Sequence, residues 1–152
     1  MRVLVTGANG FIGQHIVRCI EKQACKINML IRNNIDYNIS KRVDIFKGDI
    51  FNNEILKKAV DGVEVVFHLV AKTHDVSNID NAKDYYKINV EGTRNLLDAC
   101  INSNIKHFIY FSSVKAMVEE SKHALDETYD CTPTTLYGKT KLMAERLVID
   151  YG

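Results

Sequence analysis

The chain opens on RVLVTGANGFIG, residues 2–13, in which an apolar run passes directly into glycines at every third position. The apolar run predicts a buried strand, and the pattern of residues 11–23 predicts a helix. Gly7 can make the tight bend between them. Without a Cβ, Gly10 lets the backbone approach a ligand, and Gly13 lets the helix pack closely against the strand. The stretch therefore predicts a strand–turn–helix unit shaped for a phosphate group.

The start of this predicted helix is the candidate binding surface. Backbone amides near Phe11 and Ile12 have no earlier helical turn to donate to, and the helix dipole adds positive charge there. We expect them to bind the pyrophosphate of a dinucleotide. The alternative is an ordinary strand-to-helix turn that needs glycine for steric reasons alone, since glycine motifs give false positives.

The rest of the chain repeats this alternation of strands and helices. We expect strands at residues 2–6, 27–31, 43–47, 63–69 and 106–111, helices at 11–23, 53–60, 84–103 and 137–151, and a polar loop at 33–40. Strands separated by helices are parallel with right-handed crossovers, and burial on both faces explains their uniform apolarity. The predicted fold is a Rossmann-type doubly wound α/β sheet of order 3-2-1-4-5, forming one dinucleotide-binding domain over residues 1–152. Such folds usually have a sixth strand, so we expect the C-terminal strands and a substrate domain to be missing.

Composition excludes several classes of protein. The 152 residues include 20 Lys and Arg against 19 Asp and Glu, a net charge of +1 that lacks the cationic excess of nucleic-acid binders. No apolar run approaches the roughly 20 residues that span a bilayer, and the N-terminal one is too short for a signal peptide. The four cysteines and five histidines show no metal-ligand spacing. We therefore expect reduced thiols, no metal site and a cytoplasmic location.

Arg32 follows the second predicted strand. It comes about 20 residues after Gly13, where NAD-binding proteins carry an acidic residue for the ribose 2′-hydroxyl. An arginine can instead pair with a 2′-phosphate through its planar guanidinium, which favours NADP over NAD. Lys41 or Arg42 could equally bind that phosphate, and a solvated arginine at a strand end is the alternative.

Tyr137 and Lys141 are four residues apart at the start of the last predicted helix, so their side chains share one face. A nearby ammonium stabilises a phenolate, which lets a tyrosine act as a base. On its own the Tyr-x-x-x-Lys pattern is weak, because any exposed helix can carry it by chance.

Six motifs occur in order along the chain. They are TGANGFIG at residues 6–13, GDI at 48–50, VFHL at 66–69, NVEGT at 89–93, YFSS at 110–113 and YGKTK at 137–141. On these motifs the whole chain resembles the extended short-chain dehydrogenase/reductases. Within them it is most similar to the NAD(P)-dependent sugar-nucleotide epimerase/dehydratase family. The SSVK stretch at residues 112–115 makes it similar, within that family, to UDP-glucose and UDP-N-acetylglucosamine 4-epimerases.

The resemblance implies a role for each group of residues. It places the pyrophosphate at Gly7, Gly10, Phe11, Ile12 and Gly13, the adenine at Asp49 and Ile50, and the nicotinamide-side ribose at Leu69, Val70, Ala71 and Thr73. It makes Asn89 the support of the loop after the fourth strand, and Ser113, Tyr137 and Lys141 the catalytic set. Tyr137 would take a proton from a sugar hydroxyl as hydride passes to the cofactor. Ser113 would hydrogen-bond that hydroxyl, and Lys141 would bind the ribose and stabilise the phenolate.

The function that the resemblance implies is an NAD(P)-dependent epimerase or reductase, an isomerase or oxidoreductase acting on a nucleotide-sugar by hydride transfer. Val114 and Lys115 stand where dehydratases of this family carry an acidic pair, which disfavours dehydration. Family members continue for roughly as long again, so this chain is expected to be the cofactor-binding and catalytic half. The alternative is a catalytically idle, truncated NAD(P)-binding module. A homodimer that covers the unpaired sheet edge is a further expectation.

Overall fold

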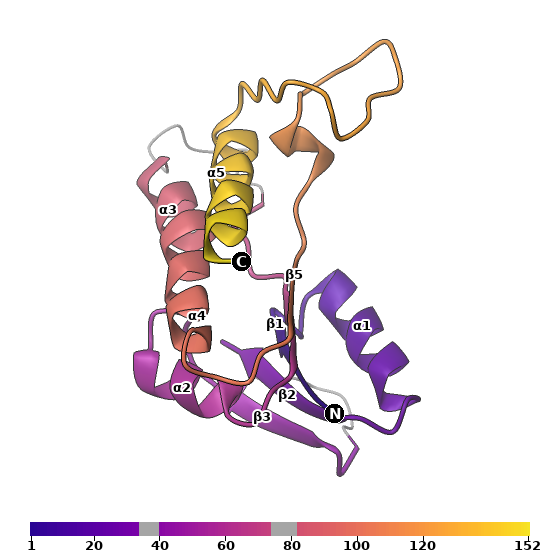
Figure 1. Ribbon diagram of the computed structural model, residues 1–152, viewed down its shortest axis with the longest axis vertical. Helices are drawn as coiled ribbons and strands as arrows, with labels where there is room; N and C mark the ends of the chain where they lie inside the picture. The colour runs from indigo at the N-terminus through magenta and orange to yellow at the C-terminus, as the bar shows by residue number, and fades with distance from the viewer. Residues whose placement is uncertain (34–39, 74–81) are drawn as a thin grey trace. The chain divides into compact units, whose positions relative to one another are not determined.

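The computed structural model describes residues 1–33, 40–73 and 82–152 (Figure 1). Most of the predicted polar loop, residues 34–39, lies outside the described residues. Contacts divide the chain into two compact units. Unit 1 comprises Met1–Val70 and Asn95–Phe111, and unit 2 comprises Ala71–Arg94 and Ser112–Gly152. All of the predicted strands lie in unit 1, and the last predicted helix lies in unit 2.

Unit 1 is built on a five-stranded parallel sheet of order β3-β2-β1-β4-β5, which confirms the predicted topology. The strands are β1 (Arg2–Thr6), β2 (Lys26–Ile31), β3 (Val43–Lys47), β4 (Val65–His68) and β5 (His107–Tyr110). Because every pairing is parallel, the carboxyl ends of the strands lie along one edge of the sheet. Gly7, Arg32, Gly48 and Leu69 each come directly after a strand at this edge. In such sheets ligands bind outside the carboxyl ends of the strands.

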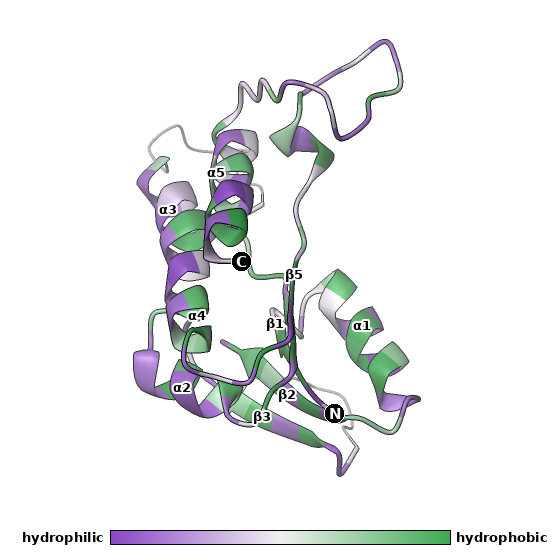
Figure 2. Cartoon of the chain, viewed as in Figure 1, coloured by the Kyte–Doolittle hydropathy of each residue, from purple (hydrophilic) through white to green (hydrophobic). Residues whose placement is uncertain are grey.

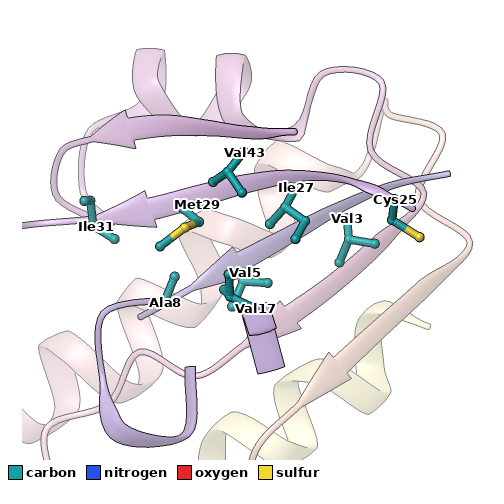
Figure 3. Close-up of a cluster of buried hydrophobic side chains, with 9 residues drawn as sticks. All are labelled: Val3, Val5, Ala8, Val17, Cys25, Ile27, Met29, Ile31 and Val43. Carbon is teal, nitrogen blue, oxygen red and sulfur yellow. The ribbon is translucent and has the colours of Figure 1, made fainter. Parts of the chain in front are cut away.

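Successive residues of β1 face opposite sides of the sheet, and each side has its own hydrophobic cluster. On one side Val3 and Val5 pack with residues of β2 and with Val17 of α1 (Phe11–Glu21) (Figure 3). On the other side Leu4 packs with α2 (Asn53–Val60) and with Leu96 of α4 (Gly92–Cys100). In Figure 2, α1 carries both green and purple segments, as a helix with one buried face should. The sheet is therefore covered on both faces, which is why the consecutive residues Val3, Leu4 and Val5 of the central strand β1 are all apolar.

Unit 2 is helical. Its elements are α3 (Ala82–Tyr86), a π-helical turn (Lys87–Glu91), the first turn of α4, the 3-10 turn η3 (Val114–Ala116) and α5 (Leu136–Tyr151). The single helix expected over residues 84–103 is therefore wrong in detail. The π turn interrupts it, and α4 ends at Cys100. In the part of the chain that the structure describes, no helix is both long enough and apolar enough to cross a membrane.

Candidate functional site

The glycine turn after β1 is closed by its own backbone. Gly7 adopts a left-handed conformation with φ of +66°, and its carbonyl oxygen accepts a hydrogen bond from the Gly10 amide at 2.9 Å. A Cβ placed on Gly13 would lie 2.3 Å from that same carbonyl oxygen and 2.8 Å from the Ala8 Cα. Since backbone atoms cannot move aside as a flexible side chain can, the turn requires glycine at both ends of the motif.

The start of α1 is open to an anion. Gly10 is its N-cap residue, no side chain caps the helix, and no acidic residue lies in the first turn. The Phe11 and Ile12 side chains are 83% and 52% exposed, so they do not cover the helix start. Uncapped amides at a helix N-terminus, beside backbone that glycine leaves bare, fit the pyrophosphate of a dinucleotide.

The end of β4 packs against this turn. A Cβ on Gly7 would lie 3.2 Å from both the Leu69 carbonyl carbon and the Val70 nitrogen, so these backbones are in close contact. The Thr6 hydroxyl accepts a hydrogen bond from the Leu69 amide at 3.2 Å and pairs with Nδ1 of the buried His68 at 2.7 Å. Leu69 and Val70 are thus held beside Gly7, a contact that no sequence motif revealed.

The remaining predicted cofactor residues of unit 1 follow β2 and β3. Arg32 is exposed directly after β2. After β3, the Asp49 carboxylate accepts a hydrogen bond from the Phe51 amide at 3.1 Å, while Ile50 is buried. Lys41 and Arg42, which the sequence left as alternatives to Arg32, precede β3 and therefore lie at the opposite edge of the sheet. Of these three cations, Arg32 is the one that follows a strand at the carboxyl edge of the sheet.

In unit 2, α5 carries Tyr137 and Lys141 in its first two turns. Thr135 is the N-cap residue, and its hydroxyl accepts a hydrogen bond from the Gly138 amide at 3.1 Å. Tyr137 is half-buried and Lys141 is only 2% exposed. The four-residue spacing places both side chains on one face of the helix, as the sequence predicted.

Ser113 is the N-cap residue of η3. Its hydroxyl oxygen accepts a hydrogen bond from the Lys115 amide at 3.2 Å. A serine hydroxyl that accepts from the backbone can still donate its own hydrogen. Ser113 can therefore act as a donor to a substrate oxygen while its position is set by the backbone.

Asn89, in the π turn, ties the segment after β4 to α5. Its side-chain oxygen accepts from the Lys72 amide at 2.7 Å, and its Nδ2 donates to the Lys72 carbonyl at 3.2 Å and to the Thr140 hydroxyl at 3.0 Å. These contacts hold the segment that contains Ala71 and Thr73. Lys72 and Thr140 were not singled out from the sequence, because contacts across 17 and 51 residues leave no local signal.

Burial perturbs Lys141. Loss of solvent lowers the pKa of its ammonium from the usual 10.5 to about 8, and the Glu145 carboxylate partly opposes this shift. Near neutral pH the side chain therefore remains mostly charged. A buried ammonium beside a tyrosine is suited to stabilising a phenolate, at some cost to folding.

Comparison with known proteins identifies the group to which this chain is related. The model of the NAD dependent epimerase/dehydratase family matches residues 3–152. The chain belongs to this family. The glycine turn, the hydrogen bonds of Asn89 and the Tyr137–Lys141 pair are therefore features of a chain of the epimerase/dehydratase family.

Three relatives show the extent of the similarity. The chain is 30% identical to the trifunctional UDP-glucose 4,6-dehydratase/UDP-4-keto-6-deoxy-D-glucose 3,5-epimerase/UDP-4-keto-L-rhamnose-reductase RHM1 of Arabidopsis thaliana, over 99% of this chain and 25% of that protein. The UDP-glucuronic acid 4-epimerase from Bacillus cereus, solved in complex with NAD, is 29% identical with a TM-score of 0.86, over 99% of this chain and 52% of that one. MoeE5, solved with UDP-glucuronic acid and NAD, is 28% identical with a TM-score of 0.88, over 99% and 49%. This epimerase/dehydratase chain spans about half the length of these solved relatives.

We expect Lys141→Met to stabilise this epimerase/dehydratase chain. Because the folded state lowers the pKa of Lys141 from 10.5 to about 8, folding of the wild type is penalised below pH 8 and recovers as the pH rises toward 10.5. The penalty corresponds to about 3 kcal/mol at pH 7. Urea unfolding at pH 7 should show a gain approaching that size in the variant, and the gain should shrink by pH 10.

Lys139→Met is the matched control, since Lys139 is exposed on the same helix. It should change the unfolding free energy by less than about 0.5 kcal/mol at either pH. Equal effects of the two substitutions would contradict the assignment of the penalty to buried Lys141.

Proposed function

We propose that this chain carries out NAD(P)-dependent hydride transfer on a nucleotide-sugar, as the cofactor-binding and catalytic half of an epimerase or reductase. The observation that carries the proposal is the uncapped start of α1 behind the closed glycine turn at the carboxyl edge of the sheet. The solved relatives named above contain NAD, and one of them also contains UDP-glucuronic acid. Both facts support a dinucleotide at this turn and a nucleotide-sugar as substrate.

The residues implied by the resemblance would hold the cofactor in this proposal. The amides near Phe11 and Ile12 would bind the pyrophosphate, and Asp49 and Ile50 would flank the adenine. The nicotinamide-side ribose would contact Leu69, Val70, Ala71, Thr73 and Lys141. When bound, the nicotinamide ring supplies a two-electron acceptor for a hydride from a sugar carbon.

Tyr137 is the catalytic base in this proposal. As the sugar carbinol is oxidised to a ketone, the Tyr137 phenolate accepts the hydroxyl proton. Ser113 donates a hydrogen bond to the same sugar oxygen, and the buried Lys141 ammonium stabilises the phenolate. In an epimerase, Tyr137 would return this proton to the sugar oxygen as the ketone is reduced from its other face, whereas in an oxidoreductase the ketone would be released.

Two measurements test the proposal in sequence. Calorimetric titration with NAD and with NADP should give binding at one site per chain, and no heat with either would refute the cofactor assignment. Absorbance at the wavelength of the reduced nicotinamide should then rise when UDP-glucose or UDP-glucuronic acid is added to the NAD(P)-loaded chain. Cofactor binding with no reduction by either sugar would favour the idle NAD(P)-binding module instead.

Arg32 makes cofactor preference a separate prediction. We propose that its exposed guanidinium, directly after β2, favours the 2′-phosphate of NADP. Arg32→Asp should weaken NADP binding at least tenfold and leave NAD binding unchanged or tighter, because a carboxylate repels the phosphate and accepts from the 2′-hydroxyl. Lys41→Asp, at the other edge of the sheet, is the control and should change neither affinity. Unchanged relative affinities in the Arg32 variant would exclude this role.

A further inference from the structure

We propose that Lys115, Glu119 and Thr135 form a positioning bridge that sets Ser113 relative to Tyr137. This proposal rests on the function proposed above, because it concerns how the catalytic set is aligned. None of the three residues belongs to that set. All of them lie in unit 2, so the bridge is contained in one compact part of the chain.

One end of the bridge holds the turn that begins at Ser113. The Lys115 amide donates to the Ser113 hydroxyl, and the Lys115 ammonium donates both to the Glu119 carbonyl at 2.9 Å and to Glu119 Oε2 at 2.8 Å. The amides of Ala116 and Met117 complete η3 by donating to the carbonyls of Ser113 and Val114. Lys115 thus joins the backbone around the catalytic serine to the Glu119 carboxylate.

The other end of the bridge holds the start of α5. The second oxygen of the same carboxylate, Glu119 Oε1, accepts a short hydrogen bond from the Thr135 hydroxyl. That hydroxyl accepts in turn from the Gly138 amide, which follows Tyr137 in the first turn of the helix. One carboxylate therefore connects the N-cap residue of α5 to the lysine that lies two residues after Ser113.

The backbones of η3 and of the first turn of α5 are in close contact. A Cβ on Gly138 would lie 2.2 Å from the Lys115 carbonyl oxygen, so α5 touches η3 directly beside Tyr137. The Thr132 amide also donates to the Met117 carbonyl at 2.6 Å. Rotation of α5 about this contact would change the separation of Ser113 and Tyr137. The bridge limits that rotation. Small displacements of catalytic groups lower rates strongly.

The hydrogen bonds of the bridge favour the ionised form of the Glu119 carboxyl group. Hydrogen bonds from Lys115 and then from Thr135 keep the pKa of Glu119 below its usual value. An isolated exposed ion pair contributes little to stability. Unit 1 offers an ion pair outside the bridge for comparison. Lys106 Nζ lies 2.7 Å from Glu64 Oε2 and the Met1 ammonium lies 3.7 Å from Glu64 Oε1, and neither cation belongs to a helix cap.

Amide hydrogen exchange tests the bridge without any need for catalysis. Thr135→Val removes the hydroxyl but keeps the shape, whereas Thr135→Ser keeps the hydroxyl. If the bridge couples the two elements, Thr135→Val and Glu119→Leu should each speed exchange of the Ala116 and Met117 amides about tenfold. Thr135→Ser and the matched control Glu64→Gln should leave them unchanged. Unaltered exchange at η3 in both disruptive variants would overturn the proposal.

Steady-state kinetics tests positioning separately from stability. Thr135→Val and Glu119→Leu should lower kcat for sugar-dependent cofactor reduction at least tenfold, with KM and cofactor Kd within twofold and with recovery in Thr135→Ser. A normal kcat in the folded variants would overturn positioning while the proposed function stands. Absence of reduction by the wild type would instead defeat the proposed function, and the exchange experiment would still decide whether the bridge exists.

Discussion

Replacing Tyr137 with phenylalanine should reduce sugar-dependent cofactor reduction by a factor of about 100 to 10,000. The substitution removes a single hydroxyl from a half-buried ring on α5, so the packing of the helix is retained. General acid–base groups contribute rate factors of this size. The proton of the sugar hydroxyl then has no side-chain acceptor at this position. Absorbance of the reduced nicotinamide during single turnover measures the effect.

Tyr129→Phe is the matched control for this experiment. Tyr129 is an exposed tyrosine in the segment that precedes α5, and its hydroxyl has no place in the proposed mechanism. Its substitution should leave the rate within twofold of the wild type. Cofactor Kd should stay within threefold in both variants, because the amides that we propose to bind the pyrophosphate, near Phe11 and Ile12, are unchanged. A Tyr137→Phe protein that reacts at the wild-type rate would remove Tyr137 as the base.

Gly13→Ala should weaken binding of either dinucleotide at least a hundredfold. The added methyl group would lie 2.3 Å from the Gly7 carbonyl oxygen, so α1 must move away from the turn. That movement displaces the amides near Phe11 and Ile12 that we expect to bind the pyrophosphate. Overpacking of this kind also destabilises a fold by about 2 kcal/mol. Calorimetry on the variant, after circular dichroism has verified its fold, measures the loss of affinity.

Gly62→Ala separates this steric effect from a general loss of stability. Gly62 has φ of +65° but no atom within 4 Å of its would-be Cβ, and it lies in the turn before β4, away from the carboxyl edge of the sheet. The left-handed conformation alone should reduce the unfolding free energy by about 1 kcal/mol. Dinucleotide affinity should be unchanged. Equal losses of affinity in the two variants would mean that α1 does not hold the pyrophosphate.

Lys141 and Tyr137 illustrate why this site costs stability. The lysine is almost fully buried, and loss of solvent lowers its pKa because a charge is unfavourable there. Lys141→Met should therefore remove reactivity while it stabilises the fold at neutral pH. Opposite effects on rate and stability are expected where a side chain is retained for chemistry.

The architecture of unit 1 followed from the sequence alone. Apolar strands separated by amphipathic helices specify a parallel sheet, and the order β3-β2-β1-β4-β5 is among the few that short right-handed crossovers permit. The glycine spacing of residues 7–13 was equally decisive, since close backbone contacts admit no side chain there. The spacing of Tyr137 and Lys141 is a property of one helix, and the five other motifs of the resemblance gave this weak pattern its weight.

Only the tertiary structure revealed the contacts between segments that are distant along the chain. The π turn interrupts the helix expected over residues 84–103, and Asn89 within it binds Lys72 and Thr140. Lys115 and Thr135 likewise both bind the Glu119 carboxylate, although Thr135 lies 16 residues further along the chain than Glu119. Local periodicity reports which face of an element is buried, but it carries no record of which side chain of another element completes a hydrogen bond. For this protein the sequence determined the sheet and the glycine turn, while packing of unit 2 decided how Ser113 and Tyr137 are held.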